Sequence, residues 1–309
     1  MMDTQVDREL LEKIADLVGK PVGAFNIRKD TGCDGRQSTE HIEITGKTDG
    51  KSGIDIRVKD GTVGEPCHIP VIITKPGIQE LVYNDFYIGE NCNVNIVAGC
   101  GIHNCGDCDS QHDGIHTFYV GKNAKVTYIE KHYGEGEGSG KRILNPQTIV
   151  YLEEGASITM ETSQIAGVDD TKRYTKCVAS GANSEVVITE KLLTHGEQHA
   201  VSEMDVILDG EGSRTRVVSR SVAKERSTQI FYPRVQGNTA CFGHVSCDAI
   251  IMGEAKVRAI PEISCNHVDA ALIHEAAIGR IAGEQILKLE TLGLTPEEAE
   301  EKILEGFLR

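Results

Sequence analysis

From about residue 87 onward, hydrophobic and polar positions follow a unit that recurs along the chain. The unit is a turn with glycine, then a small residue, then alternating positions at which β-branched residues are frequent. We find copies at residues 89–96, 121–128, 153–160, 181–188, 210–217 and 252–259. The first five copies are spaced by roughly 30 residues, which is typical of a solenoid, a propeller or an array. Period-2 alternation excludes helical repeats, which need an amphipathic stretch with a period near 3.6 residues.

A β-helix explains this repeat better than a propeller does. Propeller blades need about four strands per 40–45 residues and characteristic aromatic positions, and only 5% of the residues are aromatic. We expect each copy to begin one strand and each period to hold about two coils of the β-helix. Small and branched residues would fill the space between the coils, and caps would cover the open edges.

The two ends of the chain have helical patterns. Residues 3–18 place apolar side chains at steps of three and four, and residues 281–292 are helical by pattern as well. A capping box from Thr295 to Glu298 begins a last helix that runs to the end of the sequence. We therefore expect a mainly β fold, a right-handed parallel β-helix core with an N-terminal helix and a C-terminal two-helix region. The expected parts are residues 1–80, 81–280 and 281–309.

Composition and charge limit the partners. The chain has 309 residues, of which 33 are glycine and none is tryptophan. Its formal net charge of −15 disfavours binding to nucleic acid or anionic membranes, because its field repels polyanions. Apolar runs stay well below the roughly 18 residues of a spanning helix and the N-terminus is polar, so we expect a cytoplasmic protein without a signal peptide. Its ten cysteines are then poor candidates for disulfides.

Three of the cysteines, Cys100, Cys105 and Cys108, have the spacing C-x4-C-x2-C between two strand copies. This spacing matches the start of a plant-type 2Fe–2S ferredoxin loop. Thiolates suit soft metals, and histidines and carboxylates lie nearby in the sequence. We predict a metal site on these three residues. A sulfur-handling site and a loop that is cysteine-rich without chemistry stay open as alternatives.

Two segments near the C-terminus carry further candidates. Cys247 alternates with apolar residues and, taken alone, fits a buried strand cysteine. His274 and Glu275 do not form H-E-x-x-H, since Ile278 stands at the last position, so a zinc-peptidase site is excluded. Adjacent residues of a strand point to opposite faces, and His274 and Glu275 therefore share a site only at a bend or across an interface. Alternatively, His274 simply bonds a backbone carbonyl.

Taken together, these segments resemble the C-terminal region of the SufB and SufD iron–sulfur cluster assembly proteins. The similar stretches are 247–253, 273–276, 281–286, 292–299 and the Gly306-Phe307 end, and their order and spacing agree. The resemblance implies a β-helix scaffold on which an iron–sulfur cluster is transiently assembled and from which apo iron–sulfur proteins receive it. It also implies that each C-terminal helical region carries one SufC-type ABC ATPase subunit.

Residue by residue, the resemblance assigns the SufB cysteine and glutamate to Cys247 and Glu275, and the SufD histidine to His274. In that family these residues are implicated near the interface of a heterodimer formed through the β-helix ends. Because this one chain carries both kinds of residue, the resemblance implies a homodimer with an isologous interface. Gly99-Cys100 also has a counterpart in SufB-like proteins. The residues without an assigned counterpart are Cys105, Cys108, Cys265 and His267.

Enzymatic activity is not expected of the chain. The sequence has no P-loop and no recognisable nucleophile–base motif. The glycine-rich residues 134–141 contain glutamates, which argue against a phosphate cradle and for a flexible turn. A carbohydrate-active β-helix enzyme would need aromatic sugar platforms, and the lack of tryptophan counts against it. The other alternative is a structural β-solenoid interaction protein whose cysteines only pack.

Overall fold

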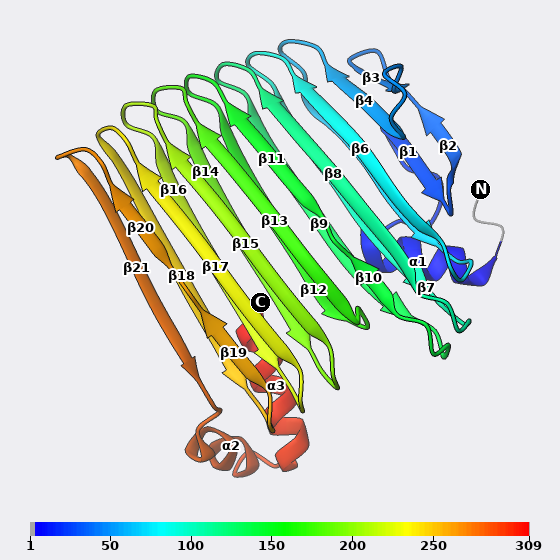
Figure 1. Ribbon diagram of the computed structural model, residues 1–309, viewed down its shortest axis with the longest axis vertical. Helices are drawn as coiled ribbons and strands as arrows, with labels where there is room; N and C mark the ends of the chain where they lie inside the picture. The colour runs from blue at the N-terminus through cyan, green and yellow to red at the C-terminus, as the bar shows by residue number, and fades with distance from the viewer. Residues whose placement is uncertain (1–3, 309) are drawn as a thin grey trace.

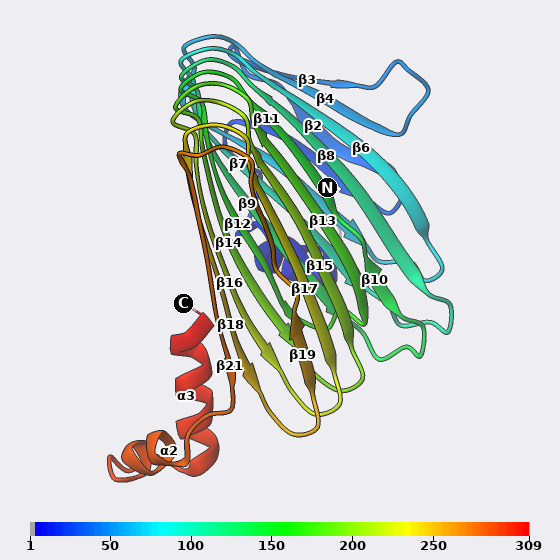
Figure 2. The same ribbon diagram turned by 60° about the vertical axis from the view of Figure 1, so that its left-hand side comes forward.

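Two long β-sheets form the core of the computed structural model, which describes residues 4–308 (Figure 1). Sheet A has the order β2 (Gly32–Gln37), β1 (Ala24–Lys29), β5 (Val63–Ile73), β7 (Asn93–His103), β9 (Lys125–Glu135), β12 (Ser157–Ala166), β14 (Glu185–Thr194), β16 (Arg214–Ala223), β18 (Cys241–Ile251) and β21 (Ala270–Gly279). Sheet B has the order β19 (Lys256–Ala259), β17 (Thr228–Gly237), β15 (His199–Leu208), β13 (Asp170–Ala179), β10 (Arg142–Leu144), β8 (Ser110–Val120), β6 (Gln79–Ile88), β4 (Gly53–Val58) and β3 (Ile42–Gly46). In sheet B, β11 (Gln147–Leu152) continues β10 and β20 (Glu262–Cys265) continues β19. Figure 2 shows the two sheets face to face, joined by turns.

Each repeat period forms one coil of this solenoid. Val94 pairs with Val126, Val126 with Ile158, and Ile158 with Val186, so residues one period apart are direct neighbours in sheet A. The expectation of two coils per period is therefore wrong. Strands β7, β8, β9 and β12 have 10 or 11 residues each, and two strands of this length with their turns use up one period. The solenoid has about eight turns.

The turn that opens each repeat explains its composition. Its residue before the small position has a positive φ, as in Asn91, Asn123 and Gly155 at +55°, +55° and +66°, a conformation that favours asparagine and glycine. The small residues that follow lie buried in one column along the solenoid: Cys92, Ala124, Ala156, Ser184 and Ser213. The copy at 252–259 does not belong to this column, because it begins β19 of sheet B at the opposite end of the strands.

The interior between the sheets changes character along each strand. Inward side chains near the glycine turns are apolar and small or branched, for example Val126 on β9 and Val186 on β14. Farther along the same strands, inward positions carry Glu130, His132 and Glu190, which are buried as well. The hydrophobic core therefore lies toward the glycine turns, and a buried polar layer lies toward the other end of the strands.

The N-terminal end of the solenoid is covered by antiparallel strands and flanked by a helix. β2 pairs antiparallel with β1, and β3 with β4, which ends both sheets. Helix α1 (Gln5–Ala15) packs on the outer face of sheet A with Leu10 and Ile14 buried. A Cβ on Gly99 would lie 2.6 Å from the carbonyl oxygen of Ile14, so this close approach of the helix requires glycine.

Helix α1 is shorter than the predicted 3–18. It ends because Asp16 adopts the left-handed conformation, with φ at 54°, while its N–H still donates to the Glu12 carbonyl. Val18, the last residue of the predicted helix, lies beyond α1 and is exposed. Residue 3 lies outside the described residues.

The C-terminal helices project from the last strand of sheet A (Figure 2). Helix α2 (Gly283–Glu290) is shorter than the predicted 281–292, and α3 (Pro296–Leu308) follows. The predicted capping box is confirmed: the N–H of Glu298 donates to Oγ1 of Thr295 at 3.2 Å, and the N–H of Thr295 donates to Oε2 of Glu298 at 2.8 Å.

The expected boundary at residues 80 and 81 falls within β6. The strands before it hydrogen-bond to strands after it, since β5 pairs with β7 and β4 with β6. Among the described residues, no helix has the length and apolar character needed to cross a membrane.

Candidate functional site

The last two strands of sheet A place the ligand candidates near the C-terminus. β18 and β21 run parallel, and their register puts Val245 beside His274. Because side chains alternate between the faces of a sheet, His274 shares the inner face with Val245 and Cys247. Glu275 shares the outer face with His244. Val245 and Cys247 are buried inside the solenoid, which agrees with this assignment.

On the inner face, the thiol of Cys247 contacts the imidazole of His274. The Sγ atom of Cys247 lies 3.2 Å from Nε2 of His274. Burial raises the pKa of the Cys247 thiol to about 12, and the carboxylates of Glu190 and Asp248 act in the same direction. Burial also lowers the pKa of His274. At neutral pH the pair is a neutral thiol beside a neutral imidazole, so metal binding at Cys247 must release the thiol proton.

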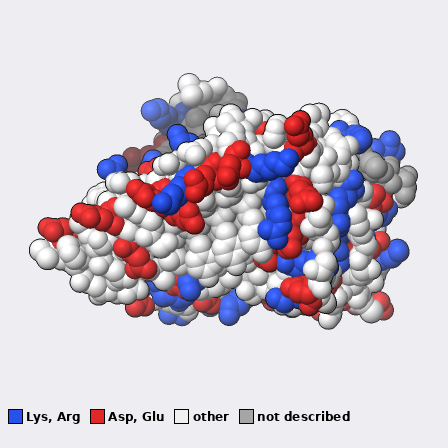
Figure 3. Space-filling view, turned by 90° about the horizontal axis from the view of Figure 1, so that it is seen from above, with Lys and Arg blue, Asp and Glu red and all other residues white. Residues whose placement is uncertain are grey.

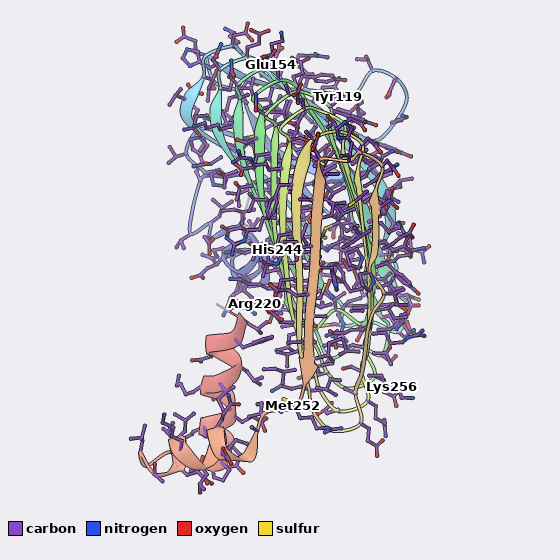
Figure 4. The ribbon with its side chains drawn as sticks, turned by 90° about the vertical axis from the view of Figure 1, so that its left-hand side faces the viewer. Tyr119, Glu154, Arg220, His244, Met252 and Lys256 are labelled. Carbon is purple, nitrogen blue, oxygen red and sulfur yellow. The ribbon has the colours of Figure 1, made fainter. Side chains whose placement is uncertain are left out.

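On the outer face, Glu275 contacts His244. Oε1 of Glu275 lies 2.8 Å from Nε2 of His244, and the glutamate side chain is 64% exposed. Figure 4 shows His244 partway along the last strands, above the C-terminal helices. His244 was not predicted from the sequence, because its distance from Glu275 along the chain gives no signal. The pairing of β18 with β21 brings the two together.

The structure therefore brings Cys247 and His274 together and keeps Glu275 on the opposite face, as the strand alternation predicted. Thiolate, imidazole and carboxylate are all ligands for iron, and thiolate is the preferred ligand of iron–sulfur clusters. Two ligand pairs on the two faces of one sheet edge can serve a single centre where a second chain meets that edge.

The edge that carries these pairs is open in the described chain. β21 is the last strand of sheet A, and it pairs with β18 on one side. Ile273 and Ile278 on this strand are 50% and 40% exposed. A ten-residue edge strand with apolar side chains is a template for pairing with another chain. The N-terminal end differs, since antiparallel strands cover it.

Inside the solenoid, a buried ion pair lies in the polar layer. Nη1 of Arg173 donates to Oε2 of Glu130 at 2.7 Å, and Nη2 lies 3.0 Å from Nδ1 of His132. Nε of Arg173 lies 3.5 Å from Oε1 of Glu190. Burial alone would raise the pKa of Glu130, but His132, Arg173 and His116 together hold it well below its usual range. Glu130 is thus a buried carboxylate that Arg173 neutralises.

His116 continues this network in one defined tautomer. Its Nδ1 lies 2.6 Å from Oη of Tyr128, which donates to Oε1 of Glu130 at 3.0 Å. Its Nε2 lies 3.1 Å from Nδ2 of Asn84, which can only donate. Nδ1 therefore carries the proton. Burial lowers the pKa of His116 to about 4, so the ring is neutral at physiological pH.

The polar layer extends toward both candidate cysteines. At one end, Glu190 accepts hydrogen bonds from Ser202 and Ser219, at 2.8 and 3.2 Å, and Ser219 is the register neighbour of Cys247. At the other end, a cavity of about 10 Å³, room for about one water molecule, is lined by Cys100 and Glu130. The two cysteines thus lie at opposite ends of one buried chain of polar groups.

Cys100 is separated from the two cysteines that follow it in the sequence. It lies on β7 and points into the solenoid, where burial and the charges of Glu80 and Glu130 raise the pKa of its thiol well above its usual value. Cys105 and Cys108 are exposed on the cysteine loop, which we define as residues 104–109. The three thiols therefore do not converge. Within residues 4–308, no three or more His, Cys, Asp and Glu side chains are arranged to hold a metal ion.

The glycine-rich residues 134–141 pack against the cysteine loop. The N–H of Gly138 donates to the Asn104 carbonyl at 3.1 Å, and the N–H of Gly140 donates to the Gly106 carbonyl at 3.0 Å. Cβ atoms on either glycine would lie 2.2 Å from a backbone oxygen of the loop. The expected turn is present, and the close approach of two backbones explains its glycines.

Cys265 and His267 share no hydrogen bond or ion pair with Cys247, His274 or Glu275 in the described chain. Cys265 is exposed at the end of β20, beside Gly237 in the register of sheet B. Nδ1 of His267 accepts the N–H of Asp269 at 3.1 Å. Both residues therefore belong to the last coil of the solenoid, at the end of β20 and in the turn that leads to β21.

Helix α3 leaves an apolar groove against the outer face of sheet A. Nη1 of Arg220 on β16 donates to the Phe307 carbonyl at 3.2 Å, and Figure 4 shows Arg220 beside the end of the helix. The groove encloses about 660 Å³. Its apolar lining consists of Ile165, Leu193, Leu304 and Leu308, with lysines and glutamates at the rim.

The chain matches a family model and several curated proteins. Residues 83–307 match the model described as SUF system FeS cluster assembly, SufBD core domain. An iron–sulfur cluster assembly SufBD family protein of Methanothermobacter thermautotrophicus strain Delta H is 30% identical over 254 residues, which cover 79% of this chain and 58% of that protein. The chain thus spans just over half the length of that relative.

Two other relatives are closer in length. A SufBD family protein of Methanocaldococcus jannaschii is 27% identical over 88% of this chain and 86% of that protein. One of Pyrococcus horikoshii is 27% identical over 94% of this chain and 88% of that protein. The family match covers both the buried polar layer and the strands that carry Cys247 and His274. This chain belongs to the SufBD family of iron–sulfur cluster assembly proteins.

Proposed function

We propose that this protein is a scaffold on which an iron–sulfur cluster is assembled at the C-terminal end of the solenoid. The observation that carries the proposal is the contact between Cys247 and His274, at 3.2 Å, on the open end of a SufBD-family solenoid. The cluster is cargo, bound while it is built and then passed to apo iron–sulfur proteins. Mixed thiolate, imidazole and carboxylate ligation suits a cluster that must leave again, because the nitrogen and oxygen ligands are weaker.

The proposal includes a homodimer formed through the open ends. Pairing of β21 with β21 of a second copy would be isologous and would satisfy both edge strands. Each chain supplies the Cys247–His274 pair on one face and Glu275 on the other. A two-fold axis at this edge would then surround the cluster with ligands from both chains. The exposure of Ile273 and Ile278 supports this arrangement, because a second copy would cover them.

The proposal also assigns the C-terminal helices to a SufC-type ABC ATPase. Leu287 and Leu292, in and after α2, are 60% and 74% exposed, and α3 borders the apolar groove of about 660 Å³. Apolar surface on a projecting helical pair is suited to a protein partner. ATP hydrolysis would belong to that partner, and the scaffold itself would turn over no substrate. Movement of the helical pairs could then open the interface that holds the cluster.

Nucleic acid and membranes are not part of this proposal. The formal net charge is −15. On the face seen in Figure 3, Lys and Arg residues alternate with Asp and Glu residues and do not form a continuous basic surface. A phosphate-rich partner would need such a surface.

Anaerobic reconstitution with iron and sulfide, followed by ultraviolet–visible absorption, tests the proposal. The wild-type protein should develop the thiolate-to-iron absorption band, and Cys247→Ala should lose at least about tenfold in cluster binding. Cys177→Ala is the matched control, because it removes another buried thiol from the same core. It should reconstitute like the wild type. An undiminished band in Cys247→Ala, or no band in the wild type, would favour a structural solenoid without cluster chemistry.

A further inference from the structure

A second pair of cysteine and histidine lies on the outside of the solenoid at the end of β7, which β9, β12, β14 and β16 separate from β18 in sheet A. Sγ of the exposed Cys105 lies 2.9 Å from Nε2 of His103. Nδ1 of the same ring lies 3.1 Å from Oε1 of Glu135, its register neighbour on β9. The scaffold function does not use these groups.

The contacts of Glu135 fix the role of the imidazole. Nζ of Lys13 on α1 lies 2.9 Å from Oε2 of Glu135. Burial would raise the pKa of Glu135, but Lys13 and His103 hold it below its usual value, so Glu135 is a carboxylate. A carboxylate at Nδ1 favours the tautomer with the proton on Nδ1 and leaves Nε2 free to accept the thiol proton. Thiol, base and orienting carboxylate thus stand in the order that activates a nucleophile.

A second exposed thiol follows three residues later in the sequence Cys105-Gly106-Asp107-Cys108. Its surroundings differ, because Asp107 lies 3.5 Å from its Sγ and raises the pKa of Cys108. The buried Asn104 holds the two ends of this segment together. Its Oδ1 accepts the N–H of Gly106 at 3.0 Å, and its Nδ2 donates to the Cys108 carbonyl at 2.9 Å. C-x-x-C with one activated thiol is the arrangement found in thiol–disulfide exchange.

We propose that Cys105 and Cys108 form a thiol–disulfide exchange site whose substrate is the disulfide of a small thiol or of another protein. His103 Nε2 takes the proton of Cys105, and the thiolate attacks one sulfur of the substrate. The substrate S–S bond breaks, and the leaving thiolate takes the proton back from His103. Cys108 then gives its proton to solvent, and its thiolate attacks Sγ of Cys105. The bond between Cys105 and the substrate sulfur breaks, and the second substrate thiolate leaves and takes up a proton from solvent.

The reaction transfers two electrons from the protein to the substrate. Two protein thiols are oxidised by two electrons to one disulfide, and the substrate disulfide is reduced to two thiols. Cys105 is the attacking residue, His103 is its base, and Glu135 is a positioning residue that acts through His103. The site needs no oxyanion hole, since charge stays on sulfur throughout.

Alkylation of the full-length native protein with iodoacetamide, read residue by residue by peptide mass spectrometry, tests the activation. Cys105 should react at least about tenfold faster than Cys108 and the exposed Cys33, because general-base assistance accelerates by that much or more. His103→Gln should bring Cys105 to the rate of Cys33, and Glu135→Gln should give an intermediate rate. His267→Gln is the control and should change nothing. Equal rates for Cys105 and Cys33 in the wild type would overturn the proposal.

Incubation with oxidised glutathione tests the exchange itself. The wild type should lose both loop thiols and carry an internal Cys105–Cys108 disulfide without bound glutathione. Cys108→Ala should stop with one glutathionyl group on Cys105, and Cys105→Ala should stay unmodified at Cys108. A wild-type protein that accumulates the mixed disulfide, or keeps both thiols, would show that the loop is not an exchange site. These variants retain Cys247, so cluster reconstitution reports separately on the scaffold function.

Discussion

At the scale of single residues, the interior of this solenoid holds charged side chains at positions where small and branched residues were expected. Arg173 and Glu130 are 6% and 2% exposed and meet at 2.7 Å. Neither charge is tolerable alone in such a place, because a buried ion without its partner loses its hydration without compensation. The pair thus constrains the sequence of both sheets, since Glu130 comes from β9 and Arg173 from β13.

Replacing Arg173 with methionine should destabilise the protein by about 3–5 kcal/mol, because Glu130 is left as an unpaired buried carboxylate. The double variant Arg173→Met/Glu130→Gln should recover most of the loss. Urea unfolding followed by far-ultraviolet circular dichroism measures both.

A surface ion pair supplies the control for that measurement. Arg226 and Glu197 lie 2.6 Å apart with side chains 68% and 77% exposed. Arg226→Met should change stability by less than about 0.5 kcal/mol, because exposed pairs contribute little. If Arg173→Met lowered the free energy of unfolding no more than Arg226→Met does, the buried pair would not stabilise the polar layer.

His116 makes stability depend on pH in a defined direction. Its pKa is lowered by burial from 6.5 to about 4. Between these values the unfolded chain binds the proton and the folded protein does not, so stability falls as the pH falls from about 6.5 to about 4. The loss from this residue is roughly 3 kcal/mol. The slope of the unfolding free energy against pH reports how many protons are bound on unfolding, and His116→Gln should lower that number by about one in this pH range. An unchanged slope would contradict the assignment.

At the scale of elements, the two helical ends differ in how much surface they leave uncovered. Helix α1 buries Leu10, Leu11 and Ile14 against sheet A. Among the described residues α2 has no buried side chain, and α3 buries Ala299 and Leu304. An amphipathic helix that covers so little of its apolar surface is suited to a partner.

Leu292→Asp should therefore weaken binding of a SufC-type ATPase without unfolding the solenoid. Leu292 is 74% exposed in the turn after α2. Val268→Asp is the matched control, since Val268 is 92% exposed in the turn before β21. Co-purification with the ATPase should lose at least about tenfold in affinity for Leu292→Asp and stay unchanged for Val268→Asp, as expected when a central apolar contact is lost. Equal binding of both variants would place the ATPase elsewhere.

The sequence predicted the elements with the strongest patterns and missed features set by pairing between coils. Period-2 alternation indicated the strands, and Thr295 and Glu298 indicated the start of α3, because these are local signals. The number of coils per period was wrong, since it depends on where each strand ends. The contact of His244 with Glu275 depends on the register between strands, and the separation of Cys100 from Cys105 depends on the direction of each side chain. Period-2 alternation along one strand does not specify either of them.

At the scale of the whole molecule, the two ends of the solenoid are built differently. Antiparallel strands finish both sheets at the N-terminal end, while the C-terminal end presents β21 and the strands β19 and β20. Figure 1 shows β21 at the far edge of the sheets from α1. The uncovered parallel edge is where the proposed second copy of the chain would bind, because an open edge strand is a template for pairing.

Ile278→Lys should shift the protein from dimer to monomer, because a charged side chain on an edge strand blocks pairing. Sedimentation velocity at micromolar concentration measures the change. Ile165→Lys is the control, since Ile165 is 53% exposed on β12, in the middle of sheet A. A wild-type monomer, or a dimer that survives Ile278→Lys, would remove the edge from the proposed interface.

In the proposed function, the cluster is assembled at the end of sheet A that β18 and β21 form. The most direct test of this site is the rate at which the protein, with its ATPase present, acquires a cluster and transfers it to an apo iron–sulfur acceptor. The double variant Cys247→Ala/Glu275→Ala removes the thiol on the inner face and the carboxylate on the outer face. This variant should fold, bind the ATPase and transfer no cluster above background. Transfer at the wild-type rate would contradict the proposed function.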